Sequence, residues 1–313
     1  MTGPARIAIL GAGAMGSVYA GLLAEAGQEV LAITRDAAHA RAIGASGLHL
    51  RGPRGDRRIA LAAATRPEGP PADIVIVATK SADAAGAVRA AGQLIGPATL
   101  VLAIQNGLGA AEEIAAVLPP GRLAVGIAQA FGASRPAPGH ARHENAGTIR
   151  LGAWQGMPAE ALARLVAIWR GTGVTAEPAA DLRAMQWEKL ICNAAYSGVC
   201  AVSGLTVGEV MDSPDLAPVS LAAAREAHAV ARARGVAVAV DDPVAHALAF
   251  GARVRAARPS VLIDLEAGRP TEIDYINGAV VREARAAGLD APVNATLTAL
   301  VRAREGQAAR ARA

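Results

Sequence analysis

Short runs of apolar, mostly β-branched residues alternate with helix-period segments through the first half of the chain. Unbroken apolar runs of this kind are typical of strands that helices cover on both faces, as in a parallel sheet. We predict strands at residues 6–10, 29–33, 74–78, 99–104, 123–128 and 148–151. Their alternation with helices predicts an α/β fold with a doubly wound sheet.

The second half has no strand pattern after about residue 175, and its apolar residues recur at helical spacing between Gly and Pro residues. Helices are predicted at residues 181–202, 218–235, 243–257, 271–288 and 292–304. We therefore divide the chain into an α/β domain at residues 1–177 and an all-helical domain at residues 178–313. The arginine-rich end, from about residue 305, is expected to be a disordered tail.

Composition narrows the class of protein. Of the 313 residues, 52% are hydrophobic, yet no run of about 18 apolar residues occurs, so we expect no membrane span. Aromatic residues make up only 3% and the arginines are dispersed, which argues against nucleic-acid binding. The two cysteines, Cys192 and Cys200, lie in one predicted helix, so we expect a reducing compartment, by default the cytoplasm.

Lysine is rare in this chain. The net charge is +4, and the 31 basic residues include only two lysines, Lys80 and Lys189. Lysine is a compact cation whose pKa can be tuned, whereas arginine stays charged. Both lysines are therefore candidate functional residues.

A glycine motif follows the first predicted strand and opens the first helix: Gly11-Ala-Gly13-Ala-Met-Gly16. In that context Gly11 permits a tight turn, Gly13 admits the pyrophosphate of a dinucleotide, and Gly16 lets the helix pack on the strand. Ala14 and Met15 then lie at the helix N-terminus, where backbone N–H groups bind negative charge. The motif predicts a Rossmann-type dinucleotide-binding domain.

The end of the second predicted strand discriminates between NAD and NADP. An NAD site usually has an acid there that binds the ribose 2′-hydroxyl, whereas this chain has Thr34 followed by Arg35. A guanidinium pairs well with a 2′-phosphate, so NADPH is the expected cofactor. Asp36 complicates this assignment, because it could point into the site in place of Arg35.

Lys80 closely follows the third predicted strand, and Asn106 follows the fourth. Ligands of open α/β sheets bind at the carboxyl ends of strands, so both side chains are placed to reach cofactor or substrate. Asn106-Gly107 also fits an ordinary turn. Lys80 also fits a cation at a helix start, although the helix dipole disfavours one there.

A polar stripe marks the first helix of the second half. Lys189, Asn193 and Ser197 are four residues apart, so they share one face among small or apolar neighbours. Burial would lower the pKa of Lys189 from about 10.4 toward neutrality, the range suited to a general acid. The alternative is a lysine whose stem packs while its ammonium reaches solvent.

Two further polar residues have local explanations. Residues 271–274 have the form of a capping box, so Glu272 fits first-turn compensation of a helix dipole. Ser260 fits a helix N-cap. His140 and His143 are three residues apart with no carboxylate ligand set in view, and no metal site is predicted.

Together these motifs resemble those of the ketopantoate reductase (2-dehydropantoate 2-reductase) family over nearly the whole chain. In chain order they are the glycine motif at 11–16, Arg35, Thr79-Lys80, Gln105-Asn106-Gly107, the strand region from Pro138 to Gly152, Trp187-x-Lys189-Leu-x-x-Asn193, Pro259-Ser260 to Asp264, and Gly268-Arg-Pro-Thr-Glu272-Ile-Asp-Tyr-Ile-Asn277-Gly278. The last motif is the most specific of them.

The resemblance implies an enzyme that reduces a 2-oxo acid to a 2-hydroxy acid with NADPH, with ketopantoate the leading substrate and pantothenate biosynthesis its pathway. By resemblance, Lys189 is the general acid and Glu272 assists it. The residues implied to contact substrate are Asn106, Asn193, Ser197 and Ser260, and those implied to contact the cofactor beside the glycine motif are Arg35, Lys80 and Asn106.

Two departures affect the substrate assignment. Ser197 replaces an asparagine that the family usually has, and Ala257 stands where the family often has another. The enzyme alternative is therefore a relative that acts on a different keto, imine or hydroxy-acid substrate. The non-enzyme alternative is a dinucleotide-sensing protein without turnover. The sequence leaves the oligomeric state open, with a homodimer as one option.

Overall fold

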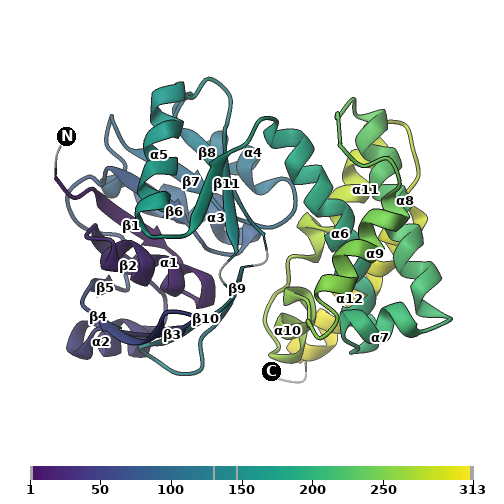
Figure 1. Ribbon diagram of the computed structural model, residues 1–313, viewed down its shortest axis with the longest axis horizontal. Helices are drawn as coiled ribbons and strands as arrows, with labels where there is room; N and C mark the ends of the chain where they lie inside the picture. The colour runs from purple at the N-terminus through teal and green to yellow at the C-terminus, as the bar shows by residue number, and fades with distance from the viewer. Residues whose placement is uncertain (1–2, 130, 146, 311–313) are drawn as a thin grey trace. The chain divides into compact units, whose positions relative to one another are not determined.

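The computed structural model describes residues 3–129, 131–145 and 147–310 (Figure 1). The chain forms two compact units, which we call the α/β unit and the helical unit. The α/β unit comprises residues 1–105 and 110–182, and the helical unit comprises residues 106–109 and 183–313. The helical unit therefore includes a short segment from the middle of the α/β half.

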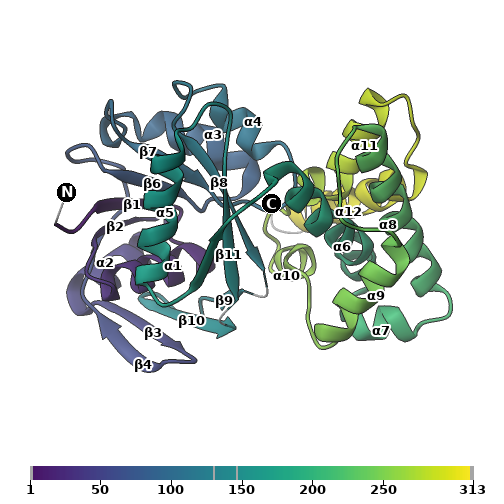
Figure 2. The same cartoon turned by 45° about the horizontal axis from the view of Figure 1, so that its top comes forward.

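The α/β unit is built on an eight-stranded sheet with the order β12-β11-β8-β7-β6-β1-β2-β5. Figure 2 labels the strands from β11 to β2 of this sheet. Its strands are β1 (Arg6–Leu10), β2 (Glu29–Ile33), β5 (Ala62–Ala64), β6 (Ile74–Val77), β7 (Leu100–Ala103), β8 (Leu123–Gln129), β11 (Thr148–Ala153) and β12 (Thr175–Pro178). The six strands predicted from apolar runs are all present. β11 and β12 run opposite to the other strands, because β11 pairs antiparallel with β8 and β12 pairs parallel with β11.

Helices cover both faces of this sheet, as the unbroken apolar strands predict. They are α1 (Ala14–Glu25), α2 (Ala37–Ser46), α3 (Ser81–Ala90), α4 (Ala110–Ala115) and α5 (Ala159–Gly171), with a 3₁₀ turn η1 (Gly92–Leu94). Successive side chains of β1 alternate between faces: Ile7 and Ile9 join one apolar cluster with α1 and α5, and Ala8 and Leu10 join another with α3 and α4. Two cores thus hold the strand ends in place.

A second, four-stranded sheet with the order β4-β3-β10-β9 completes the α/β unit. Its strands are β3 (Leu48–Gly52), β4 (Gly55–Ile59), β9 (Gly132–Ser134) and β10 (His140–Asn145). β3, β4 and β9 were not predicted, because strands such as GDRRI carry mostly polar residues. β10 lies within the strand region from Pro138 to Gly152 that the family resemblance indicated. β12 was also missed: it pairs with β11 just where the strands were expected to stop.

The helical unit contains α-helices and one 3₁₀ turn. They are α6 (Leu182–Ser203), α7 (Val207–Asp212), α8 (Leu216–Ala233), α9 (Pro243–Arg253), α10 (Ser260–Glu266), η2 (Ile273–Tyr275), α11 (Asn277–Ala286) and α12 (Pro292–Arg310). The helix predicted over 271–288 is interrupted, since η2 precedes α11. The helix predicted over 243–257 ends at Arg253, four residues earlier. The short helix α7 was not predicted, and α10 was indicated only by the N-cap expected at Ser260.

The arginine-rich tail differs from its prediction as a disordered segment. α12 continues through Arg310, while residues 311–313 lie outside the described part of the chain. Two side chains anchor this last stretch: Arg304 donates to the carbonyls of Ala201 and Val202, and Glu305 accepts from the Thr271 amide at 2.6 Å. Alanine, glutamine and arginine also favour the helix here.

Buried amides tie α6 to its neighbours. Asn277 Nδ2 donates to the Ala194 carbonyl at 2.9 Å and to Asn294 Oδ1 at 2.8 Å. Asn294 Nδ2 in turn donates to Glu226 Oε2 at 2.7 Å. Gly198 leaves room for this contact, because a Cβ there would lie 3.3 Å from Asn277 Oδ1. The network connects α6, α8, α11 and α12, and so steadies the helix that carries Lys189.

Within the described residues, no helix combines the length and the apolar character that crossing a membrane requires.

Candidate active site

The glycine loop after β1 has the geometry that its sequence predicts. Gly11 has a φ of +95°, and a Cβ on it would lie 2.6 Å from the Thr79 amide nitrogen. A Cβ on Gly16 would lie 2.2 Å from the Gly11 carbonyl oxygen. A Cβ on Gly13 would meet no atom within 4 Å. Gly11 and Gly16 are therefore required by the turn, whereas Gly13 borders open space.

The first turn of α1 suits an anionic ligand. Gly13 is the N-cap residue and supplies no side chain to the N–H groups of the turn, and that turn contains no acid. Ala14, Met15 and Gly16 therefore present backbone donors beside the space over Gly13. This is the arrangement that binds a pyrophosphate at a helix N-terminus, so the residues present fit a dinucleotide.

His39 connects the glycine loop to the small sheet. The Gly139 amide donates to His39 Nδ1 at 2.9 Å, so the proton of a neutral ring lies on Nε2. Nε2 is 3.0 Å from Ser17 Oγ, and that hydroxyl donates to the Ala12 carbonyl at 3.2 Å. Burial lowers the pKa of His39, and the Arg135 guanidinium lowers it further. Sequence reasoning missed this residue, which has no motif of its own.

The end of β2 carries two arginine–carboxylate pairs. Arg35 is 90% exposed, and its guanidinium lies 2.9 Å from the Asp83 carboxylate. Asp36 caps α2 by accepting from the His39 amide at 3.1 Å, and it also accepts from Arg135 at 2.7 Å. The N-cap role of Asp36 was predictable from its residue type, whereas Arg135 was not found.

Lys80 and Gln105 lie at the carboxyl ends of neighbouring strands. Lys80 is half-buried and is the N-cap residue of α3, directly after Thr79. Gln105 Nε2 donates to the Val77 carbonyl at 2.7 Å and to the Thr79 carbonyl at 3.2 Å. These bonds join the carboxyl ends of β6 and β7. The glycine loop follows the carboxyl end of β1, at the same edge of the sheet. The prediction that Lys80 stands at a strand end is consistent with this placement.

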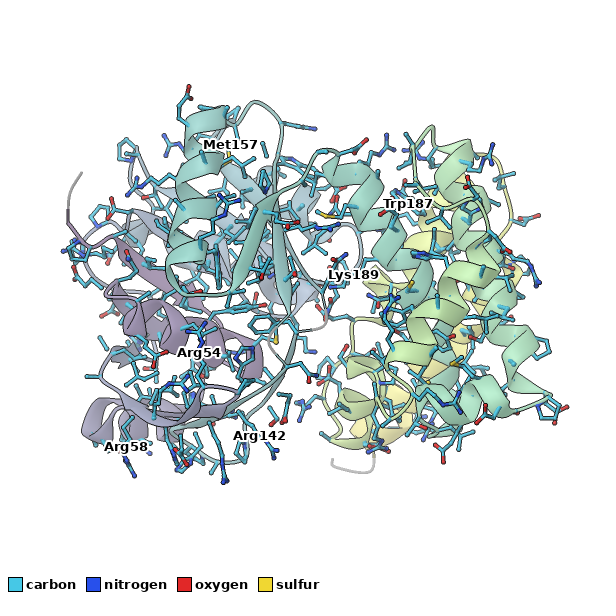
Figure 3. All side chains as sticks on the ribbon, in the orientation of Figure 1. Arg54, Arg58, Arg142, Met157, Trp187 and Lys189 are labelled. Carbon is cyan, nitrogen blue, oxygen red and sulfur yellow. The ribbon has the colours of Figure 1, made fainter. Side chains whose placement is uncertain are left out.

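In the helical unit, Lys189, Asn106 and Glu272 form one hydrogen-bonded cluster. Lys189 lies on α6 (Figure 3), and its Nζ donates to Asn106 Oδ1 at 2.9 Å. Asn106 Nδ2 donates to Glu272 Oε2 at 3.5 Å, and Glu272 is only 5% exposed. Burial lowers the pKa of Lys189 to about 8, and the Glu272 carboxylate opposes that effect. An ammonium, an amide and a buried carboxylate are thus brought together from three distant parts of the sequence.

The loop that carries Asn106 packs onto the helical unit through its backbone. The Leu108 amide donates to the Tyr275 carbonyl at 2.8 Å, and Arg282 donates to the Leu108 carbonyl at 3.0 Å. Gly107 has a φ of +80°, and a Cβ there would lie 1.8 Å from the Tyr275 carbonyl oxygen. The Asn106-Gly107 pair is therefore a turn, as one interpretation had it, and the same turn places the amide against Lys189.

The remaining candidates have simpler surroundings. Asn193 is half-buried and Ser197 is buried, and both continue the stripe of Lys189 along α6. Ser260 is exposed and is the first residue of α10, so the N-cap is Pro259 and the prediction for Ser260 was wrong by one position. In the described chain, Ser260 stays outside the hydrogen-bond network of Lys189.

Glu272 differs from its predicted role in a capping box. It precedes the 3₁₀ turn η2, and α11 begins only at Asn277. Thr271 Oγ1 accepts from the Ile273 amide at 3.2 Å, so the threonine stabilises the turn without the helix that was expected. The carboxylate is consequently available to the cluster around Lys189.

The described histidines do not form a metal site. No group of three or more His, Cys, Asp or Glu side chains in the described residues could hold an ion. His49 contacts His140, with 2.9 Å between the two Nδ1 atoms, and its Nε2 contacts Asp56. His143 stacks on Phe131.

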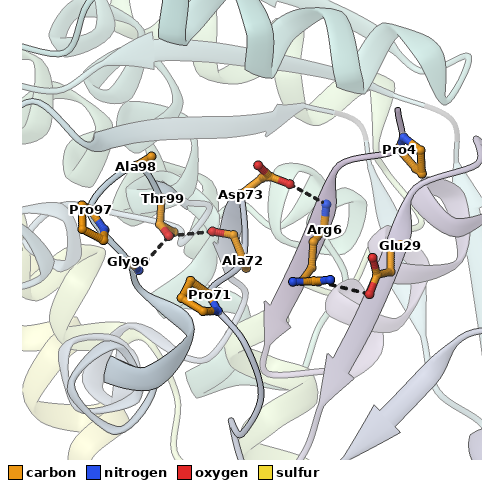
Figure 4. A pocket seen from close by; sticks show the side chains of 10 residues that line it. All are labelled: Pro4, Arg6, Glu29, Pro71, Ala72, Asp73, Gly96, Pro97, Ala98 and Thr99. Carbon is orange, nitrogen blue, oxygen red and sulfur yellow. Dashed lines mark hydrogen bonds and ion pairs between the residues drawn. The ribbon is translucent and has the colours of Figure 1, made fainter. Parts of the chain in front are cut away.

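A pocket of about 360 Å³ lies at the opposite, amino-end edge of the main sheet (Figure 4). Its polar groups are engaged with one another: Asp73 accepts from the Arg6 amide at 2.8 Å, and Thr99 Oγ1 donates to the Ala72 carbonyl at 2.6 Å. Arg6 also pairs with Glu29 at 3.1 Å. These contacts join the starts of β1, β2, β6 and β7, and we assign the pocket a structural role.

A dinucleotide-binding sheet and a helical unit with a lysine–amide–carboxylate cluster define the class of dinucleotide-dependent oxidoreductases. Comparison with known proteins identifies the family within this class. Residues 7–156 match the family model described as Ketopantoate reductase PanE/ApbA, and residues 181–305 match its C-terminal counterpart. The chain therefore belongs to the ketopantoate reductase family, as its motifs predicted.

Individual relatives extend over nearly the whole chain. A protein of Halobacterium salinarum named 2-dehydropantoate 2-reductase is 32% identical and covers 95% of this chain and 98% of its own length. A crystal structure of a PanE/ApbA family ketopantoate reductase from Ralstonia eutropha is 33% identical, with a TM-score of 0.89 over 97% of this chain and 99% of the other. A D-mandelate dehydrogenase with NADH and anilino(oxo)acetate is 26% identical, with a TM-score of 0.88 over 97% and 99%.

Proposed function

We propose that this chain catalyses the NADPH-dependent reduction of 2-dehydropantoate to pantoate, a step of pantothenate biosynthesis. The observation that carries the proposal is the cluster of Lys189, Asn106 and Glu272 in a chain whose relatives are named 2-dehydropantoate 2-reductase. The alternative of a dinucleotide sensor without turnover has no need of a half-buried ammonium hydrogen-bonded in this way.

Lys189 is assigned as the general acid. When bound, NADPH supplies a hydride to the carbonyl carbon, and negative charge grows on the ketone oxygen. A lysine whose pKa is about 8 remains mostly protonated at neutral pH, yet it is a far stronger acid than an ordinary lysine. It can therefore stabilise the developing alkoxide and then protonate it. Solvent returns the proton to Lys189 after product leaves.

Asn106 and Glu272 orient this acid. The amide oxygen of Asn106 accepts from the Lys189 ammonium, while its NH₂ group faces the Glu272 carboxylate. This polarity keeps the amide in one orientation, with its oxygen toward the ammonium and its NH₂ group toward the carboxylate. Glu272, being buried, also offers a carboxylate for a substrate hydroxyl. Asn193, Ser197 and Ser260 are proposed to hold the rest of the substrate.

Features of the α/β unit support the proposed cofactor. The loop of Gly11, Gly13 and Gly16 is proposed to hold the pyrophosphate, and Arg35 the 2′-phosphate. The Arg35–Asp83 pair is exposed, so its net contribution is small and Arg35 can exchange its carboxylate for a phosphate. Lys80 and Asn106 are proposed to contact the reacting end of the cofactor.

The experiment is a steady-state assay of NADPH oxidation with 2-dehydropantoate beside a panel of other 2-oxo acids, each also run with NADH. Selective turnover of 2-dehydropantoate with NADPH supports the proposal. Binding of NADPH without turnover of any 2-oxo acid contradicts it and favours a sensor.

A second candidate function is the interconversion of a bulkier 2-oxo acid and its 2-hydroxy acid. Two observations favour it: the D-mandelate dehydrogenase has nearly the same fold over the whole chain, and Ser197 and Ala257 replace larger amides usual in the family. Smaller side chains at two substrate positions suit a different acyl group. Benzoylformate, the 2-oxo acid that corresponds to mandelate, therefore belongs in the panel. A higher kcat/KM for it than for 2-dehydropantoate would select this candidate.

A further inference from the structure

The end of β2 contains a charge that opposes the proposed cofactor. Asp36 directly follows Arg35, the residue proposed to bind the 2′-phosphate. An acid in this region of the fold serves NAD, because its carboxylate accepts from the ribose 2′-hydroxyl and repels a 2′-phosphate. The Arg135 guanidinium bonded to Asp36 lowers the pKa of this carboxyl, so protonation at neutral pH does not remove the charge. Another group has to neutralise it.

Both oxygens of the Asp36 carboxylate are engaged. Oδ1 accepts from the His39 amide at 3.1 Å, which is the N-cap bond of α2. Oδ2 accepts from Arg135 Nη1 at 2.7 Å. The cap fixes the side chain against its own helix, and the guanidinium cancels its charge. The carboxylate is consequently turned to structural partners.

The two arginines at this site differ in how firmly they are held. Arg35 is 90% exposed and pairs with an acid that is 46% exposed. Arg135 is 30% exposed, and it reaches Asp36 from the segment after β9, 99 residues along the chain. The Arg35 pair is the more exposed of the two, whereas Arg135 donates to a carboxylate that is also fixed as the N-cap of α2. We therefore expect Arg35 to exchange its partner more readily than Arg135 does.

We propose that Arg135 determines the preference for NADPH over NADH by masking the Asp36 carboxylate, while Arg35 contacts the 2′-phosphate. This inference rests on the proposed NADPH dependence. It makes Arg135 a specificity residue that acts through another side chain.

The test measures binding by isothermal titration calorimetry with two fragments, adenosine 2′,5′-bisphosphate and adenosine 5′-monophosphate, which differ only in the 2′-phosphate. In Arg135→Ala, the bared carboxylate should weaken the bisphosphate about tenfold, the effect of one like charge in a largely solvated site, and should leave the monophosphate unchanged. The loss should shrink as salt is raised, since screening weakens charge repulsion.

The decisive variant is the double substitution Arg135→Ala with Asp36→Asn. Asparagine preserves the N-cap but carries no charge, so the double variant should recover the bisphosphate affinity of the unmodified protein within about twofold. Arg142→Ala is the matched control, because it removes an arginine paired with Glu144 on β10 and should change neither fragment. Arg135→Gln keeps a hydrogen-bond donor without charge and should behave as Arg135→Ala does. It replaces Arg135→Ala if the alanine variant has too low a melting temperature for the titration.

The outcomes separate the two proposals. If the unmodified protein binds both fragments equally, the NADPH assignment itself fails. If it prefers the bisphosphate and Arg135→Ala retains that preference, the masking role is refuted. A loss in Arg135→Ala that the double variant does not recover also refutes masking, because Arg135 would then act on the phosphate directly.

Discussion

Replacing Asn106 with aspartate tests how the cluster sets the acidity of Lys189. The substitution is nearly isosteric and places a carboxylate oxygen where the amide oxygen now accepts from Nζ at 2.9 Å. Two unit charges at that distance attract by about 6 kcal/mol at an effective dielectric constant of about 20, before desolvation takes back most of the gain. The net attraction that is left should raise the pKa of Lys189 from about 8 to between about 9 and 10. A shift of this size is typical of an adjacent opposite charge.

The assay is the pH dependence of kcat/KM for the 2-oxo acid at saturating NADPH. Reduction needs a protonated lysine, so in the unmodified protein the rate should fall as pH rises through about 8. In Asn106→Asp that decline should move upward by about one to two pH units, and the maximal rate should fall about tenfold because a weaker acid transfers its proton less readily.

Asn106→Ala is the matched control. It removes the amide without adding charge, so the rate should fall while the decline stays near pH 8, since burial of Lys189 is what lowers its pKa. An Asn106→Asp profile that declines at the same pH as Asn106→Ala would refute the reasoning, because the basic limb would then report another group.

Three further predictions concern single side chains. Lys189→Ala should lower kcat by about 10²–10⁴, the usual loss for a general acid, while NADPH titrations give an unchanged Kd. Arg35→Ala should weaken NADPH about 10- to 150-fold and NADH hardly at all, as charge-assisted bonds to a 2′-phosphate require; equal losses in the two KM values would contradict that role. His39→Gln should flatten the acid side of the stability profile. The pKa of His39 is lowered on folding from its ordinary 6.5, so its contribution is present above pH 6.5 and is lost as pH falls below it. Urea unfolding between about pH 5 and 8 measures this, with His228→Gln as the control because His228 is a buried histidine of the helical unit.

The sequence predicted the elements whose structure is determined by the pattern of their own residues. Strands such as Ile74–Val77 are unbroken apolar runs, and the glycine loop follows one of them into a helix, so spacing alone was sufficient. Strands such as Gly55–Ile59 were missed because polar residues dominate them and pairing in the small sheet decides their structure. Ser260 was misplaced by one residue because proline occupies the cap position.

The site was predictable as a set of residues but not as an arrangement. Asn106 lies 83 residues from Lys189 and 166 from Glu272, and no periodicity links such separations. Lys189 was found from its polar stripe and Asn106 from its strand end, while the family resemblance supplied the role of Glu272. That Asn106 stands between the ammonium and the carboxylate depends on the Tyr275 carbonyl, and a backbone acceptor has no sequence signature. The bond between Arg135 and Asp36 was likewise beyond prediction, because it joins two segments 99 residues apart in the sequence.

The backbone attachment of residues 106–109 to the helical unit bears on recombination between relatives. A chimera joined only near residue 182 would combine Asn106 from one parent with Lys189 and Glu272 from the other. Its Gly107 would also have to fit against a foreign Tyr275 carbonyl, a contact with no room for a side chain. Exchange of substrate preference between family members therefore calls for two crossovers around the loop as well as one at the start of α6. The residues that must be inherited together, 106–109 and the helical unit, are therefore not continuous in the sequence.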